Sequence, residues 1–388
     1  MLNHTSFVRF TCLLSAVIMF TSCRDEENPI TVTPQLRQQI DYAKLTDTTT
    51  YATFFTDKAS VKTVDLTNGN NRLLMFRAIN TYNGTAVGSG AALDATVLKN
   101  MFSNTGNPFS GTANTALNSA GVQLRNVTAS SLSAVDAEKE RQALETAFNA
   151  IATASQSVSA VASEGKAGKL DRYLVDAKGI EWGQIIQKSL IGAFQMDYIG
   201  NVLLSDARLS ADNTTLVAGK NYTQLEQNWD EAFGILTTNP AYGKNATENS
   251  SGESFAGSYL WEYNPTDFPN IHKAFLMGRA AIVNNDLTTL KTQATFIRRA
   301  MEKSVANAAL GYLSKWKTGT TDAARAHAIG EGVGFVYSLR YAKLNGADAA
   351  FSDAILNNLI YSTPNGFWGL TNTKIDAAST AIKTKFGL

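Results

Sequence analysis

Apolar residues recur at helical spacing through most of the chain and seldom alternate strictly with polar ones. Between 221 and 236 they fall at i, i+4, i+7, i+8 and i+11, which is one face of a helix. These positions are Leu225, Trp229, Ala232, Phe233 and Leu236. Asn221 is the predicted N-cap of this helix. Residues 180–204 carry two apolar rows, so that helix is expected at the centre of a bundle.

Several other segments have helix signals. Ser133 and Asp136 have the spacing of a capping box, which predicts a helix over 134–155. Ser352 is expected to begin a helix near the C-terminus. The remaining expected helices cover 35–45, 70–81, 91–103, 289–316 and 373–385.

Three long polar stretches separate these helices, at 104–133, 206–220 and 239–270. Loops of this length usually bind a partner or pack onto a scaffold. The third contains Trp261 and Tyr263, so we expect it to fold against the bundle. The pattern predicts an all-α fold with two packed helical-bundle halves. We place the boundary at the first stretch, between an N-terminal helical region, 35–133, and a main bundle region, 134–388.

The N-terminus has the pattern of an export signal. Arg9 precedes an apolar stretch from Phe10 to Phe20, and Thr21-Ser22-Cys23 follows. Roughly 7–15 apolar residues before small ones are typical of a secretory signal rather than a membrane-spanning helix. A cysteine at this point resembles a bacterial lipoprotein signal, in which the Cys23 thiol carries lipid. The alternative is a plain secretory signal with a chance cysteine.

This interpretation assigns residues 1–22 to a signal peptide and 23–34 to a proline-containing tether. The acidic run from Asp25 to Glu27 resembles signals that send lipoproteins to the outer face of the outer membrane. We therefore expect a lipid-anchored protein of the outer membrane, exposed at the cell surface. The alternative for the acidic run is an ordinary solvated tether.

Composition then excludes several classes of function. The chain has two cysteines in 388 residues, and signal removal with lipidation would leave no free thiol, so cysteine nucleophiles and thiolate metal sites are excluded. Lys and Arg number 34 against 33 Asp and Glu, and this balance gives no electrostatic basis for nucleic-acid binding.

His327 and Glu331 are the first candidate site. They lie at i and i+4, so they share a helix face. One interpretation is a pair that holds a ligand or a metal ion. The alternative is a helix-stabilising pair, with Gly330, Gly332 and Gly334 permitting close helix packing.

Charged residues next to tryptophans are the second candidate. Asp230 follows Trp229, and Glu181 precedes Trp182. Arg279 lies in an apolar segment, where a buried charge needs a partner. We expect a polar site between helices in which Arg279 pairs with Asp230 or Glu181. The alternative for each residue is a solvated helix flank.

Four strings resemble a family of roughly 400-residue Gram-negative lipoproteins in the imelysin-like group. They begin at Lys178 (KGIEWGQIIQKSLIGAF), Asn228 (NWDEAFG), Gly278 (GRAAI) and Ala326 (AHAIGEGVGFVYSLR). The resemblance implies an all-α protein of two bundle halves, linked to iron acquisition, with a site between them. Imelysins carry Gly-x-His-x-x-Glu. Here Arg325 stands at the glycine position, and Glu331 lies one residue later than the motif glutamate.

These observations predict a non-enzymatic binding protein for nutrient uptake, with iron or haem as one ligand class. One alternative is a glycan-binding lipoprotein that partners an outer-membrane transporter. Trp261 and Tyr263 would then stack on sugars. The other is a divergent metallopeptidase that uses His327, Glu331 and a third ligand.

Overall fold

The computed structural model describes residues 36–112, 114–239 and 255–388, and Gln35–Leu388 form one compact unit. Thirteen α-helices and a single two-stranded hairpin lie in these residues, which confirms the predicted all-α class. The predicted signal peptide, Cys23 and the tether lie outside the described residues. The division at 104–133 stays a prediction.

One set of helices packs around the apolar face of α7. Leu225, Trp229 and Phe233 are buried along it, as their spacing predicts. Helix α7 contacts α2 and α10, and α10 contacts α11. This set and its neighbours comprise α1 (Tyr51–Phe54), α2 (Thr67–Ser89), α3 (Ala95–Ser103), α6 (Asp206–Leu209), α7 (Gln224–Leu236), α9 (Ala256–Tyr263), α10 (Phe268–Asn284) and α11 (Leu287–Thr318).

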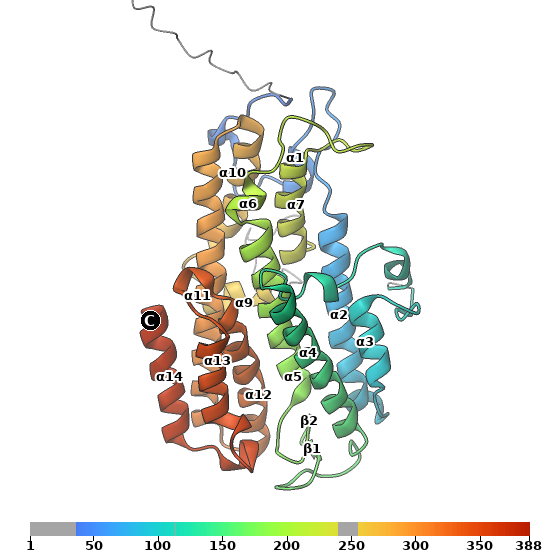
Figure 1. Ribbon diagram of the computed structural model, residues 1–388, viewed down its shortest axis with the longest axis vertical. Coiled ribbons are helices and arrows are strands. Elements are labelled where there is room, and N and C mark those ends of the chain that lie inside the picture. The colour runs from blue at the N-terminus through green and yellow to red at the C-terminus, as the bar shows by residue number, and fades with distance from the viewer. Residues whose placement is uncertain (1–35, 113, 240–254) are drawn as a thin grey trace, which may run out of the picture. The chain divides into compact units, whose positions relative to one another are not determined.

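A second set of helices packs around α12. Helix α12 contacts α5, α11 and α13, while α4 contacts α5 and α14 contacts α11. In Figure 1, α10 and α12 lie beside different parts of the long helix α11. The second set comprises α4 (Ala134–Ser155), α5 (Trp182–Leu190), α12 (Asp322–Ser338), α13 (Ala349–Leu356) and α14 (Asn372–Phe386). Strands β1 (Gly168–Leu170) and β2 (Tyr173–Val175) form an antiparallel hairpin that the sequence patterns did not predict.

The central helix predicted over 180–204 changes its winding partway. Helix α5 continues into a π-helix over Ile191–Leu203, buried on most sides. Two buried polar side chains of this π-helix form hydrogen bonds with other parts of the chain. Gln195 donates to the carbonyl of Ile235 and accepts from the amide of Ala256. Asp197 accepts hydrogen bonds from the backbone and side chain of Ser131.

Two predicted helix caps are wrong, and a third is confirmed. Thr223 caps α7 in a capping box with Glu226, because Asn221 is occupied by tertiary hydrogen bonds. Asp348 caps α13, so Ser352 lies one turn inside that helix. Ser133 caps α4 as expected, by accepting from the amide of Asp136.

The predicted loops are more helical than their polarity indicates. Residues 239–270 include α9 and the start of α10, and Tyr259 and Phe268 are buried, so the described part does fold against the bundle. The helix expected over 35–45 is wrong, because only Tyr42–Lys44 is helical, as one 3₁₀ turn. No helix among the described residues is long and apolar enough to cross a membrane.

Candidate functional site

The candidate residues lie in two separate clusters rather than one site. Arg279 pairs with Asp230 and not with Glu181, which instead contacts His327. Trp229 belongs with the first cluster, and Glu331 with the second. The predicted pairing of Arg279 with a carboxylate is therefore correct, and the candidate residues do not all meet in one place.

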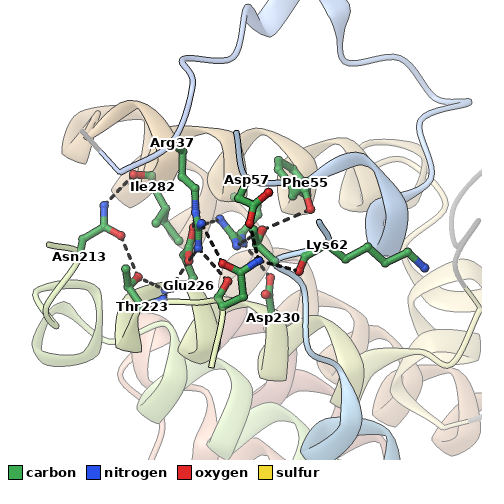
Figure 2. Close-up of polar contacts among 12 residues, drawn as sticks. Arg37, Phe55, Asp57, Lys62, Asn213, Thr223, Glu226, Asp230 and Ile282 are labelled. Carbon is green, nitrogen blue, oxygen red and sulfur yellow. Dashed lines mark hydrogen bonds and ion pairs between the residues drawn. The ribbon is translucent and has the colours of Figure 1, made fainter. Parts of the chain in front are cut away.

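The first group, the Arg279 cluster, contains Arg37, Tyr51, Glu226, Asp230 and Arg279. Arg279 donates from Nε to Asp230 at 3.0 Å and from Nη1 to Glu226 at 2.8 Å. Arg37 donates to Glu226 at 2.9 Å and 3.1 Å, and the Tyr51 hydroxyl donates to Asp230 at 2.6 Å. Figure 2 shows Arg37, Glu226 and Asp230 among these polar contacts. All five side chains are buried, so the cluster has the character of a closed structural network.

Burial and pairing act in opposite directions on the acids of the Arg279 cluster. Burial raises the pKa of Asp230 to about 6, although the Arg279 charge opposes this rise. Burial also disfavours the ionised Glu226 carboxyl, but Arg279 and Arg37 outweigh it and lower the pKa of Glu226. The cluster ties the segment that carries Arg37 and Tyr51 to helices α7 and α10.

Trp229 is a core residue rather than a ligand contact. Its side chain is fully buried, and its Nε1 donates to the carbonyl of Phe275 at 2.9 Å. The indole lies against Gly278 on α10, where any side chain would overlap it. The glycine in the Gly278-Arg279 string therefore permits this contact.

The second group, the His327 cluster, contains Glu181, Lys188, His327 and Glu331. His327 Nδ1 lies 2.8 Å from Glu181 Oε2, and its Nε2 lies 3.7 Å from Glu331 Oε1. Lys188 Nζ lies 3.2 Å from the same Glu331 oxygen. Tyr173 of the hairpin stacks on the imidazole, with ring centroids 4.1 Å apart. The i, i+4 pair on α12 is thus extended by two residues of the adjoining segment 181–188.

Close packing of α12 on α5 brings these charges together. A Cβ atom at Gly334 would lie 2.5 Å from the Cβ of Lys188, and one at Gly330 would lie 3.1 Å from the Cβ of Glu181. The close approach of α12 to α5 therefore depends on these two glycines. The packing role of Gly330 and Gly334 is confirmed, and this packing assembles a charged cluster, while the interpretation of His327 and Glu331 as a ligand-holding pair stays a prediction.

Burial also perturbs the His327 cluster. Burial raises the pKa of Glu181, although the neighbouring His327 opposes the rise. Burial lowers the pKa of Lys188, although Glu331 opposes the fall. Desolvated ionisable groups of this kind are concentrated at functional sites.

Two cavities beside the His327 cluster form what we call the polar cleft. One, of about 330 Å³, is lined by Asn80 and Asn83 of α2, by Gln184 and Gln187 of α5, and by Glu181 just before α5. The other, of about 620 Å³, is lined by Asn80 and Gln187 again, and by Tyr259, Tyr312 and Glu331. The two shared residues place the cavities side by side.

The polar cleft contains buried polar atoms without partners. Asn83 is 7 % exposed, and neither its Oδ1 nor its Nδ2 makes a hydrogen bond within the described residues. Glu331 Oε2 is likewise unpaired there. A buried group left unsatisfied costs about 1–3 kcal/mol, and such groups in a native protein require an explanation. Among the described residues, unpaired atoms also occur away from the cleft, at Asp230 Oδ2 for example, but Asn83 and Glu331 line its cavities.

Sequence reasoning found Glu181, His327 and Glu331 but missed the amides and Lys188. A signal was present, because Asn80 and Asn83 lie at i, i+3 on a helix that also carries buried Met75 and Ile79. Gln184 and Lys188 repeat that polar row on α5 at i, i+4. A polar row on a buried helix predicts a lined cavity or a second polar surface.

The donor set does not resemble a metal site. No group of three or more His, Cys, Asp or Glu side chains in the described parts of the chain could hold a metal ion. Both imidazole nitrogens of His327 already face carboxylates. The cluster is therefore better suited to hydrogen bonding than to coordination.

Comparison with known proteins identifies a family without an assigned activity. No curated protein and no solved structure matches the chain significantly. A family model described as a domain of unknown function, DUF4856, matches residues 50–388. That match includes α1 to α14, the polar cleft and nearly all of the Arg279 cluster. The chain belongs to the DUF4856 family.

Proposed function

We propose that this chain is a lipid-anchored binding protein that takes up a small polar solute in the polar cleft and serves nutrient acquisition. The observation that carries this proposal is the buried, unpaired amide of Asn83 at the wall of an open cavity. Cavities of roughly 300–1,000 Å³ with a few convergent polar groups are typical small-molecule sites.

Binding is favoured over catalysis by the geometry of the charged groups. A general acid or base needs a proton-transfer atom facing the substrate. His327 Nδ1 contacts Glu181, and Nε2 faces Glu331. A metallopeptidase would need a third ligand beside His327 and Glu331, and the described residues place none there.

The N-terminal sequence and the family resemblance support the place of action. An export signal that ends at Cys23 supports a lipid anchor, and the acidic residues after it support the outer face of the outer membrane. The imelysin-like resemblance supports a role in nutrient uptake, with an outer-membrane transporter as a partner. Because of this resemblance, haem and ferric citrate are included with organic solutes in the binding experiment that follows.

A blocking substitution tests the cleft. Gly84 lines the smaller cavity, and a Cβ atom there would meet nothing within 4 Å. We expect Gly84→Phe to fill the cavity. Gly88 has the same open space one turn along α2 but does not line the cleft, so Gly88→Phe is the matched control.

The measurement is thermal stabilisation of the mature protein by a panel of sugars, amino acids, nucleosides, dicarboxylates, haem and ferric citrate. Ligand binding to the folded state raises the melting temperature. We expect at least one solute to stabilise wild type and Gly88→Phe, but not Gly84→Phe. No stabilisation by any solute, or equal stabilisation of both variants, would overturn the proposal.

A further inference from the structure

The geometry points to a neutral carbohydrate of two or more sugar units as the ligand of the polar cleft. This inference rests on the proposed binding function and names its substrate class. Three features carry it: each acid that lines the cleft has a basic side chain beside it, an unpaired amide lies at one wall, and another wall of the smaller cavity is apolar.

The carboxylates that line the cleft each have a basic side chain beside them. Glu181 lies 2.8 Å from His327, Glu331 lies 3.2 Å from Lys188, and Glu262 lies 3.4 Å from Lys315. Arg172 also lines the smaller cavity, and Arg77 lines the larger one. A charged ligand would have to displace existing pairs, whereas a neutral ligand leaves them intact.

The polar groups that remain free are well matched to hydroxyls. Asn83 offers one unpaired acceptor and an unpaired amide donor group at the same wall. Gln187 donates to the Asn80 Oδ1 atom at 2.5 Å, and Gln184 accepts from Lys188 at 2.9 Å, so the neighbouring amides are held in position. Each sugar hydroxyl both donates and accepts, and adjacent hydroxyls can satisfy both atoms of one amide.

The smaller cavity also has an apolar wall. Val87, Ile151 and Leu174 line it together with the ring of Tyr173. A sugar ring has C–H faces as well as hydroxyl edges, so it can contact this wall while its hydroxyls meet the amides. Tyr173 is held in place by stacking on His327.

The extent of the cleft sets the ligand length. The cavities of about 330 Å³ and 620 Å³ share Asn80 and Gln187 as lining residues, so a ligand longer than one ring would contact both sides of this hydrogen-bonded pair. A single sugar ring would occupy only one of them. We therefore expect affinity to rise from monosaccharide to trisaccharide.

Titration calorimetry on the mature protein tests this inference. The probes are neutral trisaccharides of glucose, galactose, mannose and N-acetylglucosamine, with the matching monosaccharides, an acidic trigalacturonate and a set of tripeptides. We expect one neutral trisaccharide to bind at least tenfold more tightly than its monosaccharide and than trigalacturonate.

Asn83→Leu supplies the decisive variant. It keeps the size of the side chain and removes two unpaired atoms, so the free protein should be as stable as wild type or more stable. Binding of the trisaccharide should fall about tenfold or more, the factor that corresponds to about 1.4 kcal/mol. The control is Ser352→Ala, which also removes an unpaired buried atom but lies outside the cleft-lining residues, and it should leave binding unchanged.

The outcomes separate this inference from the proposed function. If tripeptides or trigalacturonate bind in an Asn83-dependent way and neutral sugars do not, the carbohydrate inference is wrong and the binding function stands. If a sugar binds equally well to Asn83→Leu, the cleft is not its site. If no probe of any class binds, neither statement survives.

Discussion

Asp230 and Glu331 are both buried acids beside a cation, and each has one carboxylate oxygen without a partner among the described residues, but their surroundings differ. Asp230 shares a closed network with Arg279 and Tyr51, whereas Glu331 lines an open cavity. Buried acids thus serve two purposes in this protein. The Arg279 cluster fastens an N-terminal segment to the bundle, and the His327 cluster forms the charged side of the polar cleft.

The raised pKa of Asp230 makes the stability of the protein depend on pH. Its pKa is about 6 in the folded state against 3.8 when exposed. The folded protein therefore binds the Asp230 proton more tightly than the unfolded chain does. The resulting gain in unfolding free energy is fully present below about pH 4 and is lost as pH rises through 6. In urea denaturation from pH 4 to pH 7, wild type should lose about 2–3 kcal/mol of unfolding free energy relative to Asp230→Asn, whose side chain does not titrate. Parallel pH curves for the two proteins would contradict this assignment.

Gly278 has no room for a side chain. A methyl group there would overlap the Trp229 indole, which is fully buried and cannot move aside. Gly278→Ala should destabilise the protein by about 1–3 kcal/mol, as expected of an overpacked core. Denaturant titration measures this, and Trp229→Phe in the same chain should recover part of the loss. A Gly278→Ala protein as stable as wild type would show that the indole is not confined there.

At the scale of elements, the glycines of α12 separate into two kinds. A Cβ atom at Gly334 would press on Lys188, whereas one at Gly332 would lie at an ordinary 3.5 Å from the Cβ of Tyr312. Gly334→Ala should therefore move α12 away from α5, lower stability by about 1–3 kcal/mol and weaken ligand binding in the cleft. Gly332→Ala should be neutral, or stabilising by up to about 1 kcal/mol through helix propensity.

Thermal unfolding and ligand titration of both α12 variants check this expectation. The pair is informative because the same substitution is made two residues apart on one helix. Equal loss of stability in the two variants would mean that helix propensity, and not the α5–α12 contact, determines the role of these glycines.

The spacing of apolar and capping residues predicts only those elements whose signal is local in the sequence. The stripe on α7 and the Ser133 cap of α4 are local, so spacing alone predicted them. The change from α5 into a π-helix leaves the apolar pattern almost unaltered and was not predicted. Short strands such as β1 and β2 are too brief for alternation to be informative.

The candidate site was harder to predict than the fold, because its contacts join distant parts of the chain. Glu181 and His327 are 146 residues apart, and no spacing rule relates them. The His327–Glu331 pair was found because it lies within one helix. Asn83 was missed, since one buried amide among many polar residues becomes informative only when its neighbours in space are known.

At the scale of the whole molecule, anchoring and binding are assigned to different parts of the chain. Every residue of the polar cleft lies within the compact unit Gln35–Leu388, and the proposed lipid site lies outside it. Two parts that share no residue can be altered independently. Loss of the lipid should therefore change the location of the protein and leave the cleft intact.

Substitution of the two cysteines tests this separation. Cys23→Ala should abolish labelling by an alkyne fatty acid in a Gram-negative host and move the protein from the detergent phase to the aqueous phase. Cys12→Ala is the matched control, because Cys12 lies in the apolar stretch that the signal peptidase would remove. It should be labelled like wild type. The solute affinity of both variants should stay within about twofold of wild type, since residue 23 is not among the residues that line the cleft. Labelling that survives Cys23→Ala would show that the anchor is elsewhere, and a large loss of affinity in that variant would show that the two parts are coupled.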